Sequence, residues 1–171
     1  MTEFNEIEPT EERKSRPGFL TVICVLSYIA LGFGVLGGML NLSNGPSSDA
    51  ELKTISVEYA KMKSDLKSQG MNDWTQMIDQ IEAMSYEMND QFYLAGIINL
   101  LIVAIGIYAV RKMWTGAKLG FHAYIIYCLL SVCALYIYVS PANIPTFMIL
   151  WNVFFSGLFV LFYGLNLKWM K

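Results

Sequence analysis

The segment GFGVLG at 32–37 matches the G-x-G-x-x-G pattern of a turn that binds a dinucleotide. An apolar run precedes it, as a strand would, and Glu58 lies about twenty residues beyond, where an acid that binds the ribose is expected. Such a turn must lead into a helix, because the N-terminus of that helix holds the pyrophosphate. The residues that follow Gly38 read MLNLSNGP and cannot be that helix. We therefore expect no nucleotide binding.

Side chains for catalysis are equally sparse. Nucleophilic catalysis needs a nucleophile, a base and an orienting group within reach of one another. His122 is the only histidine, and no Asp, Glu or Cys is expected to share a pocket with it. Its place a few residues after Lys118 favours a histidine at a membrane interface over a proton relay. The sequence predicts that the chain is not an enzyme and offers no catalytic residue.

Sulfur ligands are present, but their spacing does not indicate a metal site. The three cysteines lie inside apolar runs and none forms C-x-x-C, which is typical of small buried side chains. Five methionines of the segment 41–91 could bind Cu(I) through their thioethers, yet no His or Cys accompanies them. Most of them fit a helical stripe, so core packing is the better interpretation. We expect no metal and no other cofactor.

The composition requires an apolar environment for much of the chain. Of its 171 residues, 55% are hydrophobic and only 15% are charged, whereas a soluble domain carries roughly 25% charged residues. Uncharged runs separate Arg16 from Asp49, Asp90 from Arg111, and Lys118 from Lys168. A soluble fold of this size cannot bury so many apolar side chains, so the lipid bilayer is an expected partner. Nucleic acid is not, because no basic stripe interleaves with aromatic residues.

The apolar runs predict an all-α integral membrane protein with four transmembrane helices, because about 20 apolar residues cross the hydrocarbon layer. We place the spans at 18–40, 92–110, 119–139 and 146–166. As one helix, the last uncharged run would measure roughly 73 Å, more than twice the hydrocarbon thickness. The SPANIP segment at 140–145 divides that run with two prolines. The other segments are a polar tail at 1–17, an extracytoplasmic helical hairpin at 41–91, a loop at 111–118 and a tail at 167–171.

The segment 41–91 carries its own helical signals. Ser48 and Glu51 form a capping-box pattern, and Gly70 is expected to end the first helix. Asn72 is expected to cap the second helix, which we expect to run almost continuously over 73–110 because no proline interrupts it. Apolar residues repeat at heptad spacing in both helices, so the two should pair. Lysines late in the first helix would then face acids early in the second, namely Asp73 and Asp79.

The distribution of Lys and Arg predicts the orientation. Eight of the twelve basic residues lie in the N-terminal tail, in the 111–118 loop and at the C-terminus. The 140–145 turn has none, and the other four lie among acids in the long segment 41–91. Because short cytoplasmic segments are enriched in Lys and Arg, we expect both termini in the cytoplasm.

Small and polar residues mark candidate contact faces inside the spans. In the first span they recur every three or four residues, at Ala30, Gly34, Gly37 and Gly38. Small residues let helix backbones approach closely, so the glycine pattern indicates a packing surface, whose partner is either within the chain or in another subunit. Asn99, Ser131 and Asn152 are expected at a similar depth below the outer face and could share one polar layer. A structural clasp is favoured over a substrate site.

The segment RPGFLTVICVLSYIALGFGVLGG at 16–38 resembles the opening of small four-span inner-membrane proteins of bacteria. Those proteins share an R-P-x-F-L-T-V sequence at the start of the first span after a short polar tail. The likeness is sharp only over these residues, and elsewhere it covers the four-span plan. The resemblance implies the bacterial cytoplasmic membrane and this architecture. No activity is assigned to the family, so it implies no site residues.

Two functions remain open from the sequence. The first is a non-enzymatic subunit or accessory factor that binds other membrane or extracytoplasmic proteins, or copies of itself. The absence of Asp, Glu, Lys and Arg from the span interiors disfavours a carrier of charged substrates. The alternative is a small oligomeric channel or facilitator for an uncharged or hydrophobic substrate, formed around the layer of Asn99 and Asn152. The hairpin, far longer than a connection requires, is expected to carry the main recognition surface.

Overall fold

The chain is all-helical in a computed structural model that describes residues 16–171. Residues 1–15 of the expected polar tail, and the side chain of Asp73, lie outside the described part. The helices are α1 (Gly18–Asn44), α2 (Asp49–Ser68), α3 (Asn72–Asp90), α4 (Phe92–Trp114), α5 (Lys118–Cys133), α6 (Leu135–Tyr138), the 3₁₀ helix η1 (Pro141–Asn143) and α7 (Thr146–Gly164). The expected helical class is confirmed.

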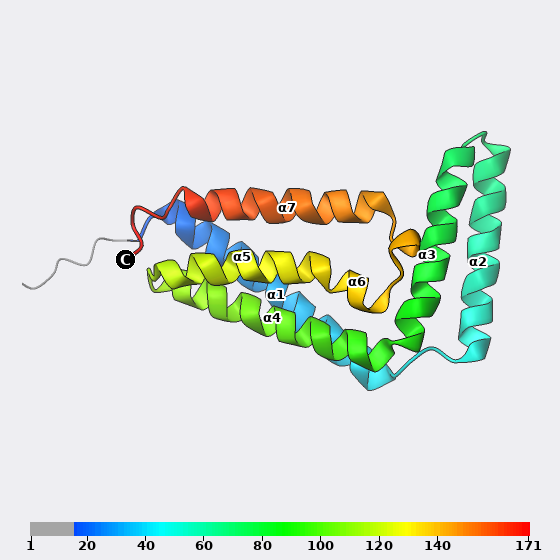
Figure 1. Cartoon of the computed structure of the whole chain (residues 1–171), viewed down its shortest axis with the longest axis horizontal. Helices are drawn as coiled ribbons and strands as arrows, with labels where there is room; N and C mark the ends of the chain where they lie inside the picture. The colour runs from blue at the N-terminus through cyan, green and yellow to red at the C-terminus, as the bar shows by residue number, and fades with distance from the viewer. Residues whose placement is uncertain (1–15) are drawn as a thin grey trace, which may run out of the picture.

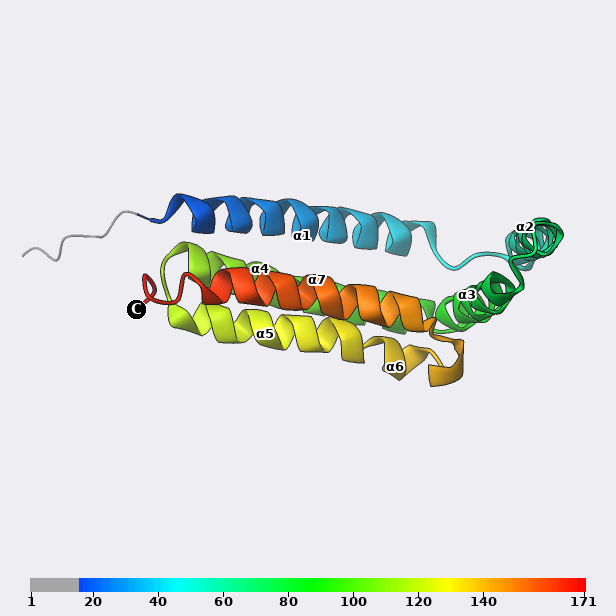
Figure 2. The same cartoon turned by 90° about the horizontal axis from the view of Figure 1, so that it is seen from above.

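Within residues 16–171, four helical segments are long and apolar enough to cross a membrane. They are α1, α4, the combined α5–α6 segment and α7, and they lie side by side in one bundle (Figures 1 and 2). The pair α2–α3 stands across one end of this bundle, which we call the α3 end. The C-terminus lies at the opposite end, which we call the tail end. The four apolar runs therefore form the four long elements expected of them.

The ends of the long helices differ from the expected spans by a few residues. α1 continues past residue 40 to Asn44, where Gly45 follows with a φ of 79°. The third segment is interrupted at Ala134, so that α5 is followed by the single turn of α6. Pro141 and Pro145 bracket the connection to α7, as expected from residues that cannot continue a helix.

The helix expected to run almost continuously over 73–110 is interrupted at a single residue, Gln91. α3 ends at Asp90 and α4 begins at Phe92, with Gln91 between them at φ −101° and ψ 23°. Figure 1 shows that α3 leaves the direction of α4 and crosses the end of the bundle. No proline or glycine lies at the break. The direction of α3 is instead set by its hydrogen bonds with the 139–145 segment, which are described below.

The caps of α2 follow the sequence closely. The Ser48 backbone N–H donates to Glu51 Oε2 at 2.7 Å, and the Ser48 hydroxyl accepts from the Glu51 backbone N–H at 3.4 Å. The Ser48 hydroxyl also donates to Glu51 Oε2 at 2.8 Å, and the bonds that the backbone N–H and then the hydroxyl of Ser48 donate to the Glu51 carboxyl lower its pKa. Gly70 follows the helix with a φ of 76°, as expected. Asn72 is the first residue of α3 rather than its cap, since Met71 holds the cap position without a side-chain bond.

Ion pairs of a single lysine, Lys63, join α2 to α3. Lys63 Nζ donates to Asp79 Oδ1 at 2.8 Å and to Glu82 Oε2 at 3.0 Å. These bonds raise the pKa of Lys63, with Asp79 the larger cause. The stabilisation is therefore complete below the ordinary pKa of lysine and is lost as the pH rises through the raised value. The expected lysine contact with Asp79 is confirmed, and Glu82 is added to it.

Candidate functional site

Burial in the bundle is concentrated toward the tail end. The buried residues of α1 are Leu20, Ile23, Cys24, Ser27 and Leu31, so none lies in the second half of that helix. In α7 the only buried residue is Tyr163, in its last turn. Figure 1 shows α1 and α7 close together at the tail end and diverging toward the α3 end. Side-chain burial in α1 and α7 thus decreases from the tail end toward the α3 end.

A buried hydrogen bond joins α1 to α7 in the half of the bundle near the tail end. The Tyr163 hydroxyl donates to Ser27 Oγ at 2.8 Å, and both side chains are buried. The ring of Tyr124 on α5 meets that of Tyr163 edge-on, with centroids 4.8 Å apart. This contact joins α1, α5 and α7, and our sequence reasoning missed it. The sequence did contain a signal, because a serine and a tyrosine lie inside two uncharged runs. Each hydroxyl needs a hydrogen-bond partner when it is removed from water.

Replacing Tyr163 with phenylalanine is expected to destabilise the bundle by roughly 0.6 kcal/mol, the average measured for hydrogen bonds between membrane helices, and by at most about 1.7 kcal/mol. Ser27→Ala should cost a similar amount, and the double variant should cost less than the sum because both changes remove one bond. The free energy of unfolding in mixed micelles, followed by circular dichroism, measures these values. Additive losses would show that the two hydroxyls do not act as a pair.

A groove lies between α5 and α7. Its volume is about 340 Å³, and four of its eight lining residues are aromatic. The lining residues are Tyr127, Ser131, Phe147, Met148, Trp151, Asn152, Phe155 and Ser156. The Ser131 hydroxyl donates to the Cys128 carbonyl at 2.8 Å, and the Ser156 hydroxyl donates to Asn152 Oδ1 at 3.3 Å. Two members of the expected polar layer, Ser131 and Asn152, are therefore brought to one surface.

Asn99, the third member of that layer, does not line the groove. It lies on α4 beside α1, where a Cβ added to Gly38 would be 3.8 Å from Asn99 Nδ2. Asn99 shares a helical face with Ile102 and Gly106, which are buried, but it is itself exposed. The sequence did not predict that Asn99 faces a different surface from Ser131 and Asn152, because the direction of a side chain around the bundle depends on how its helix is rotated.

The small residues of α1 fall on two different faces. A Cβ added to Gly34 would lie 3.4 Å from Val103, and one added to Gly38 would lie 3.0 Å from Leu100, so both glycines contact α4. Gly37 has no atom within 4 Å of such a Cβ, and Ala30 is exposed. Gly34 and Gly38 thus find their partner within this chain, and the other two face away from it.

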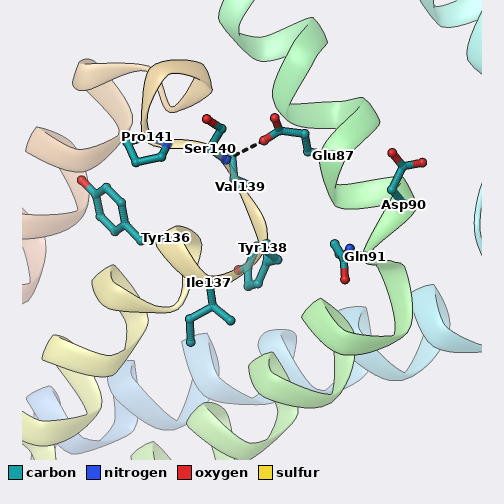
Figure 3. A pocket seen from close by; sticks show the side chains of 9 residues that line it. All are labelled: Glu87, Asp90, Gln91, Tyr136, Ile137, Tyr138, Val139, Ser140 and Pro141. Carbon is teal, nitrogen blue, oxygen red and sulfur yellow. Dashed lines mark hydrogen bonds between the residues drawn. The ribbon is translucent and has the colours of Figure 1, made fainter.

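A network of polar contacts holds α3 to the segment between α6 and α7 (Figure 3). The Ser140 backbone N–H donates to Glu87 Oε2 at 2.6 Å, and Asn143 Nδ2 donates to Glu87 Oε1 at 2.8 Å. Gln80 Nε2 donates to the Ala142 carbonyl at 3.0 Å. A hollow of about 400 Å³ lies beside this contact, lined by the residues labelled in Figure 3. Since both oxygens of Glu87 accept hydrogen bonds, this carboxylate acts as a clamp between α3 and the turn.

The opposite end of the bundle is also fixed. The Lys171 backbone N–H donates to the Gly116 carbonyl at 2.7 Å, and the Lys118 N–H donates to the Lys171 carbonyl at 2.9 Å. The Arg16 guanidinium lies over the Trp114 ring, 3.8 Å from its centroid. The C-terminal residues therefore fold against the α4–α5 loop.

Reactive side chains are dispersed in the described part of the chain. His122 is exposed near the start of α5, with Nδ1 3.1 Å from the Lys118 carbonyl. Cys24 and Cys128 are buried and Cys133 is exposed. No group of three or more His, Cys, Asp or Glu that could hold a metal ion lies within residues 16–171. Comparison with protein-family models, with curated proteins and with solved structures found no match for this chain.

Proposed function

We propose that this chain is a non-enzymatic membrane subunit or accessory factor whose α2–α3 pair binds another protein outside the cytoplasm. In this proposal the four apolar helices span the bacterial cytoplasmic membrane with both termini in the cytoplasm. The apolar length of the helices, the basic residues at the tail end and the resemblance of residues 16–38 support that placement.

The attachment of α3 to the bundle carries the proposal. Helix–helix connections usually need about 2–8 residues, yet this connection forms two helices and a capping box. Glu87 and Gln80 hold α3 to the 139–145 segment, and Asn89 Oδ1 accepts from the Ser47 N–H at 2.7 Å. The pair is therefore held at a fixed angle, and a surface with a fixed shape loses less entropy when it binds.

The exposed side chains of α2–α3 suit a protein partner. No residue of α2 is buried. Trp74 is 53% exposed and Val57 is 68% exposed, and a tryptophan is a frequent anchor at protein interfaces. Three acids of α3 already have partners within the chain, since Lys63 binds Asp79 and Glu82 and the 139–145 segment binds Glu87. We therefore assign recognition to the exposed apolar side chains more than to the acidic face.

The orientation is tested with a reporter fused after Lys171. A reporter that is active only in the cytoplasm is expected to be active, because Lys and Arg gather at the tail end. A second fusion within α2 should give the opposite result with the same reporter. An inactive Lys171 fusion together with an active fusion within α2 would contradict the orientation.

Recognition is tested by replacing residues 49–89 with a short Gly/Ser linker. The four spans are expected to insert, because each is apolar enough alone. Proteins that copurify with the full chain in mild detergent, identified by mass spectrometry, should be lost from the shortened one. Trp74→Ala in the full chain is the finer test, since it leaves the capping box and the Lys63 ion pair intact. Retention of every partner by the shortened chain would exclude α2–α3 as the binding element.

A further inference from the structure

The α5–α7 groove presents polar groups at a depth where the proposed membrane has none of its own. Asn152 lies six residues after Thr146, which corresponds to about 9 Å along α7 at 1.5 Å per residue. The hydrocarbon layer is about 30 Å thick, so this amide lies inside it. Phospholipid carbonyls and headgroups lie nearer the interface, and acyl chains offer no hydrogen-bond acceptor.

The hydrogen bonds within the groove leave one group of donors without an acceptor. The hydroxyls of Ser131 and Ser156 both donate within the chain, the first to a backbone carbonyl and the second to Asn152 Oδ1. Asn152 Nδ2 carries two N–H groups and has no acceptor among residues 16–171. An unpaired donor in hydrocarbon costs several kcal/mol, so the groove favours an occupant that supplies an acceptor at this depth.

The remaining walls restrict the chemistry of that occupant. No charged side chain lines the groove, so a charged headgroup would enter without a counter-charge. Trp151 and Phe155 meet with ring centroids 4.9 Å apart, and Tyr127 faces them from α5. The planes of the Trp151 and Phe155 rings are inclined by 74°, and the face of either ring can stack against one planar ring. A volume of about 340 Å³ falls within the range of roughly 300–1,000 Å³ found for sites of small molecules.

We propose that this groove binds an uncharged amphiphile whose planar ring carries a carbonyl. Asn152 Nδ2 donates to the carbonyl, the ring lies against Trp151 and Phe155, and the apolar chain of the ligand extends into the lipid. The proposal shares the membrane location with the proposed function and does not involve α2–α3. A failure to bind the ligand would therefore not contradict protein recognition by α2–α3. A failure of recognition by α2–α3 would likewise not contradict ligand binding in the groove.

The test uses the full chain in nanodiscs of phosphatidylcholine, with a benzoquinone that carries a decyl chain as the probe. We expect saturable quenching of tryptophan fluorescence that is absent in Trp151→Phe, and an infrared shift of the bound carbonyl stretch to lower frequency. Asn152→Leu should weaken binding at least tenfold and remove the infrared shift. Decylbenzene, which has the ring and chain without the carbonyl, should bind the wild type and Asn152→Leu equally.

Asn99→Leu is the matched control, because this amide lies on α4 outside the groove and its loss should leave probe binding unchanged. The circular dichroism spectrum and unfolding midpoint of each variant establish that it is folded. Equal binding by the wild type and Asn152→Leu, or no saturable binding by the wild type, would overturn the proposal. So would an Asn152→Cys variant that forms disulfide-linked dimers unaffected by the probe, because a second copy would then fill the groove.

Discussion

Gly120→Ala is expected to destabilise the bundle by about 1–3 kcal/mol, although it adds a single methyl group. A Cβ at this position would lie 2.5 Å from Met113 N and 2.7 Å from the Ala109 carbonyl oxygen. Both atoms belong to the backbone of α4, so no side-chain rotation can relieve the contact. The variant must therefore separate α4 from α5.

Gly157→Ala is the matched control for this prediction. Gly157 lies in the middle of α7, and a Cβ there meets no atom within 4 Å. Because alanine is favoured over glycine inside a helix by roughly 0.5–1 kcal/mol, the control should be neutral or slightly stabilised. The measurement is the free energy of unfolding in mixed micelles, followed by circular dichroism. Equal stability of the two variants would show that α4 and α5 do not meet through backbone at Gly120.

The existence of the four long helices could be predicted from the sequence because it depends on local composition. A run without charge and with enough apolar length indicates its own helix, whatever the rest of the chain does. The start of α2 could be predicted for the same reason, since Ser48 and Glu51 cap one another over three residues. Gly70 likewise ends its helix through a local φ of 76°.

The break between α3 and α4 could not be predicted, because it depends on residues far apart in the chain. Glu87 binds Ser140 and Asn143, which lie more than fifty residues further on. Near Gln91 no residue disfavours a helix strongly, so the local sequence is compatible with a continuous one. The position of α3 across the bundle is a tertiary effect, and helix propensity is too weak to oppose it.

The sequence did not predict which surfaces the candidate residues contact. Ala30, Gly34, Gly37 and Gly38 fit spacings of three or four, and periodicity alone does not decide which of them face α4. Asn99 and Asn152 likewise lie on different surfaces, the first beside Gly38 and the second in the α5–α7 groove. Which face a small residue occupies depends on the way in which bulky side chains, such as Leu100 and Tyr127, fill the space between helices.

Glu87→Ala is expected to release α3 from the turn that precedes α7. The variant loses both bonds of the clamp, to the Ser140 N–H at 2.6 Å and to Asn143 Nδ2 at 2.8 Å. A hydrogen bond contributes about 1 kcal/mol net, so we expect a loss of about 2 kcal/mol, equivalent to roughly 30-fold faster exchange of the Ser140 amide hydrogen. Hydrogen exchange read by mass spectrometry of peptides covering 139–145 measures this change.

Two variants make the Glu87 result specific. Glu87→Gln keeps an oxygen that accepts from one of the two donors and should give an intermediate rate. Asp90→Ala removes an exposed acid one helical turn further along α3 and should leave the Ser140 amide unchanged. An exchange rate in Glu87→Ala equal to that of the wild type would mean that the apolar contact of Met84 with Val139 and Ile144 holds α3 by itself. The fixed angle on which recognition by α2–α3 depends would then rest on packing, and Met84→Ala would be the change that releases it.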